Sequence, residues 1–231
     1  MLTLYHHPFC PFSRAIRLAL GEYGLAVDLV EERVWERRMD FLVINPAGTL
    51  PVLFHGDGTP PVCGSRAIVE YVDEVLAGAA GGRRLMPQNP FERAETRRLL
   101  DWFDHKLYEE VSAYLLHERM YKRFMTPEQG GGSPDSTAIR AARSNIKYHL
   151  RYIGKLAERR NWLAGDELSH ADLAAAAHLS CIDYLGEVPC DAFEPARHWY
   201  ARIKSRPAFR PLLNEQIAGM APALSYGDLD F

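Results

Sequence analysis

The apolar pattern of this chain changes once, near residue 78, and this change limits the folds that the chain can adopt. Before residue 78, short strand-like stretches are separated by Gly and Pro, whereas long helical patterns dominate the rest. The junction, residues 79–90, combines glycines and prolines with no periodicity, which is typical of a linker. We therefore expect a sheet-containing domain at residues 1–78, a helical domain at 91–218 and a tail at 219–231.

The first 78 residues indicate a small sheet with helices packed on it. We expect four strands, at residues 2–5, 27–34, 50–54 and 61–63. We expect helices at residues 11–23 and 36–43, and a third helix that starts from an N-cap at Ser65. The order βαβαββα predicts an α/β domain in which the first helix connects two parallel strands.

Composition excludes several functional classes. The chain has 231 residues, of which 47% are hydrophobic and 25% charged, as in an ordinary globular protein. Its net charge of 27 − 30 = −3 argues against nucleic-acid binding, and no apolar run is long enough for membrane insertion. There is no secretory signal, and the four cysteines have neither disulfide nor metal-ligand spacing. We expect a cytoplasmic protein without a metal site.

Four strings along the chain resemble those of glutathione transferases. The string His7-Pro-Phe-Cys-Pro-Phe-Ser-Arg14 is similar to the N-terminal motif of the cysteine-type omega class and of glutaredoxins. The strings at residues 45–53 and 64–71 fall where the family has its cis-proline strand and its third helix. The string at residues 162–173 resembles the capping motif of the helical domain, with Ser169 at the N-cap and Asp172 three residues later. The resemblance implies a glutathione transferase (GST) fold, a thioredoxin-like domain followed by an all-helical domain, usually in a homodimer.

The resemblance assigns roles to residues at the start of the first helix and at the cis-proline. The backbone N–H groups and the dipole of that helix would favour the Cys10 thiolate and depress the thiol pKa. In a cysteine-type transferase, Cys10 would form a mixed disulfide with glutathione, with Ser13 as a nearby hydrogen-bond donor. Pro51 would be the cis-proline that exposes the Leu50 backbone to glutathione. The alternative is that Cys10 is unused and that Pro51 only shapes the domain.

One departure from the family pattern lies at Gly64. The family places Glu or Gln directly before the serine that precedes the third helix, and this chain has Gly64 before Ser65. Loss of a charged hydrogen-bonding partner costs roughly 1.5–3 kcal/mol, which is about a tenfold to hundredfold loss of affinity. We therefore expect a degenerate glutathione site, formed by Cys10, Leu50, Pro51, Gly64 and Ser65, with no catalytic residue and no cofactor.

The helical half contains a stripe of basic residues at spacings of three or four. This basic stripe comprises Arg140, Arg143, Lys147, Arg151, Lys155 and Arg159. Such a stripe is either a solvated face paired with acids of the preceding helix or a contact surface for an acidic partner or a second protomer. The acids available for such pairing are Asp101, Asp104, Glu109 and Glu110.

The C-terminal tail alternates acidic and apolar residues, and it predicts a partner-binding segment. Its expected contact residues are Tyr226, Asp228, Leu229, Asp230 and Phe231. Arg140, Arg143, Lys147 and Trp35 are further candidates, although Trp35 also suits packing at the rim of the cleft.

Three features together resemble a branch of the family that acts in cell division in alphaproteobacteria. They are the acidic and apolar tail, the string Cys10-Pro-Phe-Ser13, and Gly64 in place of the usual Glu or Gln. What this resemblance implies is binding to polymers of the tubulin-like protein FtsZ at the division site, without catalysis. The alternative is a cysteine-type glutathione transferase or thiol transferase that uses Cys10 and Ser13 and binds glutathione.

Overall fold

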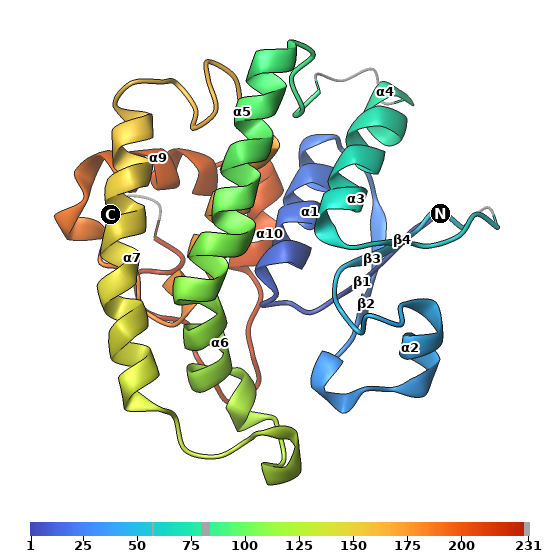
Figure 1. Cartoon of the computed structure of the whole chain (residues 1–231), viewed down its shortest axis with the longest axis vertical. Coiled ribbons are helices and arrows are strands. Elements are labelled where there is room, and N and C mark those ends of the chain that lie inside the picture. The colour runs from blue at the N-terminus through green and yellow to red at the C-terminus, as the bar shows by residue number, and fades with distance from the viewer. Residues whose placement is uncertain (57, 80–83, 229–231) are drawn as a thin grey trace.

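The structure, a computed structural model, describes residues 1–56, 58–79 and 84–228 (Figure 1). Its sheet has the strand order β2-β1-β3-β4. The strands are β1 (Leu2–His6), β2 (Val27–Glu31), β3 (Val52–Phe54) and β4 (Val62–Cys63). β1 pairs parallel with β2 and antiparallel with β3, and β3 pairs antiparallel with β4. The parallel pair requires a crossover, and α1 (Pro11–Glu22) supplies it.

The other elements of the first half follow the predicted order, with shifted boundaries. They are α2 (Met39–Ile44) and α3 (Ser65–Tyr71), which continues through a π-helical stretch (Val72–Leu76) into α4 (Ala77–Ala79). β2 ends at Glu31, earlier than expected, because a 3₁₀ turn follows at Val34–Glu36. Ser65 is the first residue of α3 and not its N-cap, because Gly64 occupies that position with φ +90°.

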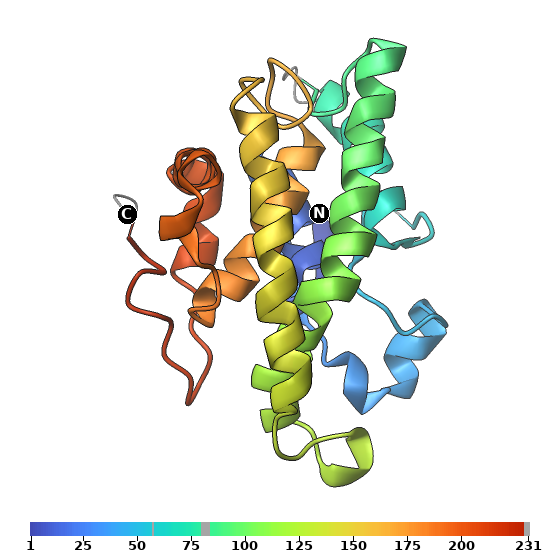
Figure 2. The ribbon, with the colours of Figure 1, turned by 60° about the vertical axis from the view of Figure 1, so that its left-hand side comes forward.

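The described residues of the second half form helices joined by loops, with no β-strand of the sheet among them. Its helices are α5 (Pro90–Asp101), α6 (Ala113–Arg119), α7 (Ser136–Ala157), α8 (His170–Tyr184), α9 (Glu194–Lys204) and α10 (Arg210–Leu213). A π-helical stretch, Trp102–Ser112, joins α5 to α6 in one long rod, and α7 lies beside this rod (Figure 2). No helix in the described ranges is long and apolar enough to cross a bilayer.

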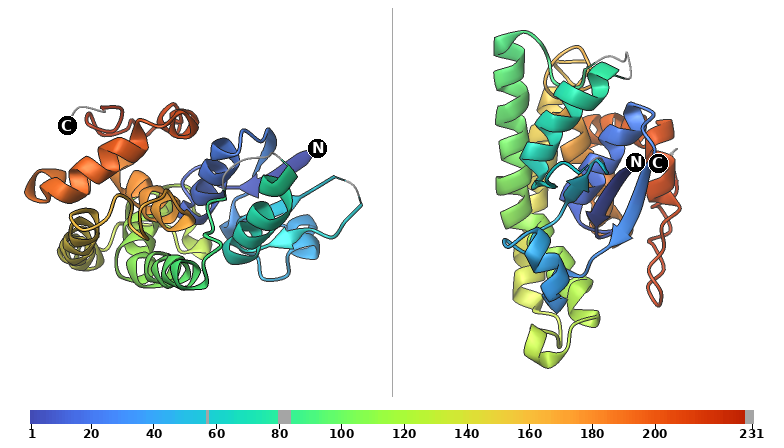
Figure 3. Two further views of the ribbon diagram at one scale, coloured as in Figure 1. Left: turned by 90° about the horizontal axis from the view of Figure 1, so that it is seen from above. Right: turned by 90° about the vertical axis from the view of Figure 1, so that its right-hand side faces the viewer.

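The two halves lie side by side (Figure 3), and one large apolar cluster contains residues of both. All residues of α8 are buried, as expected for a helix surrounded on all sides, and α8 packs against α1 of the first half. Leu4 of β1, Ile16 of α1 and Leu179 of α8 belong to the same apolar cluster. The predicted class, a mixed-sheet domain followed by a helical domain, is confirmed. The expected linker at residues 79–90 includes residues 80–83, which lie outside the described residues.

Candidate functional site

Cys10 lies at the N-cap of α1, where the sequence places it, but its thiol is not activated. Burial raises the pKa of the Cys10 thiol above its ordinary value. Hydrogen bonds with Ser13 and with the backbone of Phe12 favour the thiolate and offset only part of this effect. The expectation of a depressed pKa at Cys10 is therefore wrong, because desolvation outweighs the helix terminus.

The cis-proline and the altered anchor lie next to each other. The Leu50–Pro51 peptide bond is cis, as the family resemblance implies, and the Pro51 carbonyl accepts a hydrogen bond from the Gly64 N–H at 3.1 Å. At φ +90°, Gly64 adopts a backbone conformation that other residues rarely occupy. A Cβ at this position would meet no atom within 4 Å. The backbone conformation, and not a lack of space, therefore disfavours a side chain there.

Trp35 packs against the loop before Cys10. Its ring lies 5.4 Å from that of His7 and 5.3 Å from that of Tyr121, measured between centroids. The Tyr121 hydroxyl donates a hydrogen bond to the Phe9 carbonyl at 2.8 Å, and the Phe9 N–H donates to His7 Nδ1 at 3.2 Å. Trp35 therefore contributes to an aromatic cluster that connects the two halves of the chain, whereas its role in partner binding stays a prediction.

A buried arginine, Arg14, joins both halves to the C-terminal segment. Its guanidinium donates to the carbonyl of Pro8 at 2.7 Å, to Ser180 Oγ at 2.8 Å and to the Tyr226 hydroxyl at 3.1 Å. It also pairs with Glu215 at 3.4 Å, and its side chain is 0% exposed. Sequence reasoning missed this cluster, although an arginine within the apolar stretch of a short helix is a detectable signal.

The structure corrects the role expected for Tyr226. Its side chain is 1% exposed, and its hydroxyl donates to the Leu212 carbonyl at 2.9 Å while it accepts from Arg14. Burial raises the Tyr226 pKa to about 12. Tyr226 is therefore not available to a partner. Asp228 is exposed, whereas Leu229, Asp230 and Phe231 lie outside the described residues.

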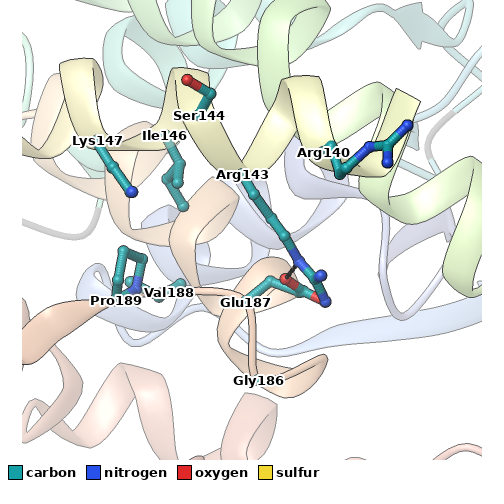
Figure 4. Close-up of a pocket in the computed structure, with 9 residues that line it drawn as sticks. All are labelled: Arg140, Arg143, Ser144, Ile146, Lys147, Gly186, Glu187, Val188 and Pro189. Atoms are coloured by element: carbon teal, nitrogen blue, oxygen red, sulfur yellow. Dashed lines mark hydrogen bonds and ion pairs between the residues drawn. The ribbon is translucent and has the colours of Figure 1, made fainter. Parts of the chain in front are cut away.

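The basic stripe follows the exposed side of α7 and meets an acid on the loop after α8. Arg143 donates to both carboxylate oxygens of Glu187, at 2.6 and 2.7 Å (Figure 4). Arg119 pairs with the same carboxylate. Arg140, Arg143 and Lys147 line a cavity of about 500 Å³ beside this loop. On the opposite side of α7, Ile146, Leu150 and Ile153 are buried in the core.

The expected pairing of the stripe with the preceding helix is wrong. Among the described residues, three of those four acids approach other groups, and none of the four forms an ion pair with the stripe: Asp101 pairs with Arg66, Asp104 lies beside His178, and Glu110 pairs with Lys106. The physical reason is that these acids have basic neighbours on their own helix or on the helices packed against it.

The predicted capping box at the start of α8 is confirmed. Asp172 accepts hydrogen bonds from the Ser169 N–H at 3.1 Å and from Ser169 Oγ at 2.9 Å. The same carboxylate also accepts from the Leu163 N–H at 2.8 Å and from Trp199 Nε1 at 3.0 Å. Asp172 thus connects three segments of the helical half, which the sequence motif alone does not indicate.

Comparison with known proteins identifies the family to which this fold belongs. A model of the glutathione S-transferase N-terminal domain matches residues 9–75, and a model of the C-terminal domain matches residues 122–207. The chain belongs to the glutathione S-transferase family. Both matched regions contain strings on which the sequence resemblance rests, and the predicted fold is confirmed.

Three similarities to individual proteins extend over nearly the whole chain. FtsZ-localized protein A of Caulobacter vibrioides is 46% identical over 99% of this chain and 98% of its own length. The solved structure of FzlA from C. crescentus has a TM-score of 0.92 at 46% identity, over 100% of this chain and 99% of that chain. The crystal structure of a glutathione S-transferase from Sinorhizobium meliloti has a TM-score of 0.96 at 52% identity and covers 100% of both chains.

Two features bear on thiol chemistry at the predicted glutathione site. The nucleophilic form of a cysteine is the thiolate, and burial raises the pKa of the Cys10 thiol, which disfavours that form. Gly64 adds no side chain that would hold glutathione. Within the described residues, no group of three or more His, Cys, Asp and Glu side chains is arranged to hold a metal ion.

Proposed function

We propose that this chain is a non-catalytic GST-like protein that binds FtsZ polymers and promotes constriction at the bacterial division site. The observation that carries the proposal is the full-length similarity to FtsZ-localized protein A, in sequence and in fold. The proposal includes a homodimer in the cytoplasm, because the family resemblance implies dimerisation. It includes neither a metal nor an organic cofactor.

The state of the cleft supports a function that does not depend on catalysis. The Cys10 thiol has a raised pKa, and the position before Ser65 has no side chain. A transferase needs both a thiolate and a firmly held glutathione. A filament-binding protein needs neither, because its contacts are made at its surface.

Co-sedimentation with purified FtsZ tests the proposal directly. We expect the chain to pellet with FtsZ polymerised in GTP and to stay in the supernatant with unpolymerised FtsZ. The Cys10→Ser variant provides the matched control, and we expect it to pellet as the parent chain does. If the parent chain remains in the supernatant with polymerised FtsZ, the proposed partner is wrong.

The second candidate function is a cysteine-type glutathione transferase or thiol transferase. It is favoured by the 52% identity to a protein described as a glutathione S-transferase from S. meliloti. Calorimetry with glutathione separates the two candidates, since we expect binding only at millimolar concentration or not at all. Micromolar binding, together with thiol-transfer activity that is lost in Cys10→Ser, would favour the enzyme.

A further inference from the structure

The cavity beside α7 has two chemically different walls. One wall is α7 itself, with the basic side chains of Arg140, Arg143 and Lys147. The other is the loop after α8, where Val188 and Pro189 add an apolar surface that continues into Ile146 (Figure 4). Figure 4 shows Lys147 directed toward Pro189 and Arg143 directed toward Glu187, while Arg140 lies at the far end. We call this cavity the α7 groove.

The groove has an excess of positive charge. Glu187 is its one acidic lining residue, and this 4% exposed carboxylate already pairs with both Arg143 and Arg119. Among the described residues, Lys147 has no acidic partner and Arg140 forms no ion pair. Arg140 donates to Thr137 Oγ1 at 3.3 Å, and its charge contributes to the lowered pKa of Asp135. Burial lowers the pKa of Arg119, and the nearby Arg143 lowers it further, as expected where cations gather.

Several other basic residues on the surface of the helical half pair with acidic neighbours. Arg98 pairs with Glu95 at 2.8 Å, and Lys122 pairs with Glu118 at 2.6 Å. Lys155 and Arg159, at the far end of the basic stripe, resemble Lys147 and Arg140 in having no ion pair among the described residues. Unlike them, these two do not line the groove. Unneutralised charge and a cavity with an apolar wall therefore coincide at the α7 groove.

We propose that the α7 groove binds an extended acidic peptide of a protein partner, with carboxylates at alternate positions and an apolar side chain between them. Residues 143 and 147 are four apart, which is about 6 Å along a helix. Alternate side chains of an extended peptide lie about 6.6 Å apart on one side, while the intervening side chain faces the opposite way. One carboxylate then reaches Lys147 and the other reaches Nη1 of Arg143, because Nε and Nη2 of Arg143 already donate to Glu187. The apolar side chain contacts Val188 and Pro189.

The apolar wall distinguishes a peptide from a small inorganic anion. Phosphate or sulfate would use the cations and leave Val188 and Pro189 uncovered, whereas an acidic and apolar peptide covers both walls. The proposal does not depend on FtsZ, because it concerns any partner that presents such a segment. Its test therefore uses a synthetic peptide and no FtsZ.

The test is fluorescence anisotropy with the labelled hexapeptide Asp-Leu-Asp-Leu-Asp-Leu. The groove variant is Arg140→Glu with Lys147→Glu, which leaves the Arg143–Glu187 pair intact. The matched control is Lys155→Glu with Arg159→Glu, which makes the same change in net charge on or just after the same helix. We expect at least a tenfold loss of affinity in the groove variant and less than a twofold loss in the control. Thermal melting verifies that both variants are folded.

A second peptide, Asp-Gly-Asp-Gly-Asp-Gly, tests the apolar wall, and we expect it to bind at least fivefold more weakly. Equal binding of the two peptides would overturn the proposal in favour of a simple anion patch. Equal losses in the groove variant and the control would also overturn it, because long-range charge would then explain the binding. If the groove variant instead loses self-association in analytical ultracentrifugation, the occupant is a second copy of this chain and the proposed partner is wrong.

Discussion

Cys10 and Arg14 lie one helical turn apart at the start of α1, yet their surroundings differ. Cys10 occupies the position of the nucleophile in a cysteine-type transferase, and burial raises the pKa of its thiol. Arg14 is completely buried, and its guanidinium contacts Ser180, Tyr226 and Glu215 from distant parts of the chain. The Arg14 side chain also lies over the Phe9 ring, with 4.1 Å between its guanidinium carbon and the ring centroid.

This contrast shows that a motif typical of a catalytic family also has a structural function. The string His7–Arg14 looks like a transferase signature, but its last residue connects the first half of the chain to α8 and to the C-terminal segment. Removing the arginine would take away a donor to the Pro8 carbonyl, Ser180 and Tyr226 and a cation paired with Glu215. Removing the thiol would take away only local contacts with Ser13 and Phe12. The resemblance of this string to an enzyme motif is therefore weak evidence for catalysis.

The largest effect is expected from replacing Arg14. The variant Arg14→Met keeps much of the side-chain volume and removes the guanidinium, and we expect it to lower the free energy of unfolding by about 3–5 kcal/mol. The variant Cys10→Ser should cost less than about 1 kcal/mol. Urea unfolding followed by tryptophan fluorescence measures both values. Equal losses in the two variants would contradict the contrast between these positions.

The next effect concerns pH and the two histidines before Cys10. Burial lowers the pKa of His6 to about 3 and that of His7 to about 4, while an unfolded histidine titrates near 6.5. Because both pKa values are lower in the folded than in the unfolded state, protonation of these rings favours unfolding. The effect is absent above pH 6.5, and the free energy of unfolding falls as the pH drops from 6.5 toward 4. At pH 5 the loss is about 2 kcal/mol for each ring.

Urea unfolding at pH 7 and at pH 5 measures this loss. Between pH 6 and 4, the slope of the unfolding free energy against pH reports the number of protons taken up on unfolding. The variant His6→Gln should reduce this number by about one. His7 has an additional reason to stay neutral, because its Nδ1 accepts the Phe9 N–H and an imidazolium has no acceptor. If the double variant His6→Gln with His7→Gln keeps the parent's pH dependence, the buried rings are not its cause.

The sequence predicted those features that depend on local patterns. The βαβαββα order, the cis bond before Pro51 and the capping box at Ser169 and Asp172 all follow from short strings or from the family resemblance that they carry. The burial of Tyr226 and the pairing of Arg143 with Glu187 could not be predicted in this way. Each depends on residues that are distant in the sequence, and only packing determines whether an aromatic residue in a tail is exposed.

A smaller effect is expected at the capping box, which serves as a second buried polar cluster for comparison with Arg14. The variant Asp172→Ala leaves the N–H groups of Leu163, Ser169 and Trp199 without their acceptor, and we expect a loss of about 2–3 kcal/mol. Ser169→Ala should cost only about 0.5–2 kcal/mol. Thermal or urea unfolding measures both. A larger loss for Ser169→Ala than for Asp172→Ala would contradict the central role of the carboxylate.

The smallest effect on stability, but a large effect on partner binding, is expected at the end of the chain. Asp228 is exposed, and its carbonyl accepts a hydrogen bond from Lys204 Nζ at 3.1 Å, a contact that a change of side chain leaves in place. Asp228→Lys should therefore cost less than about 1 kcal/mol, as is usual for exposed charges. Its co-sedimentation with FtsZ should be weakened more at low salt than at high salt, because exposed charges are screened within roughly 10 Å.

Two truncations separate the role of the tail in binding from its role in folding. Removing residues 229–231 keeps every contact of Tyr226 with Arg14 and Leu212, so we expect melting close to that of the parent and loss of co-sedimentation with FtsZ. Removing residues 225–231 also removes Tyr226, and it should destabilise the fold as a buried aromatic truncation does, by about 3–5 kcal/mol. If the shorter truncation still co-sediments fully, the tail is not the binding segment. Charge reversal at Arg140 and Lys147 then becomes the next test, because the α7 groove is another surface whose basic side chains could bind an acidic partner.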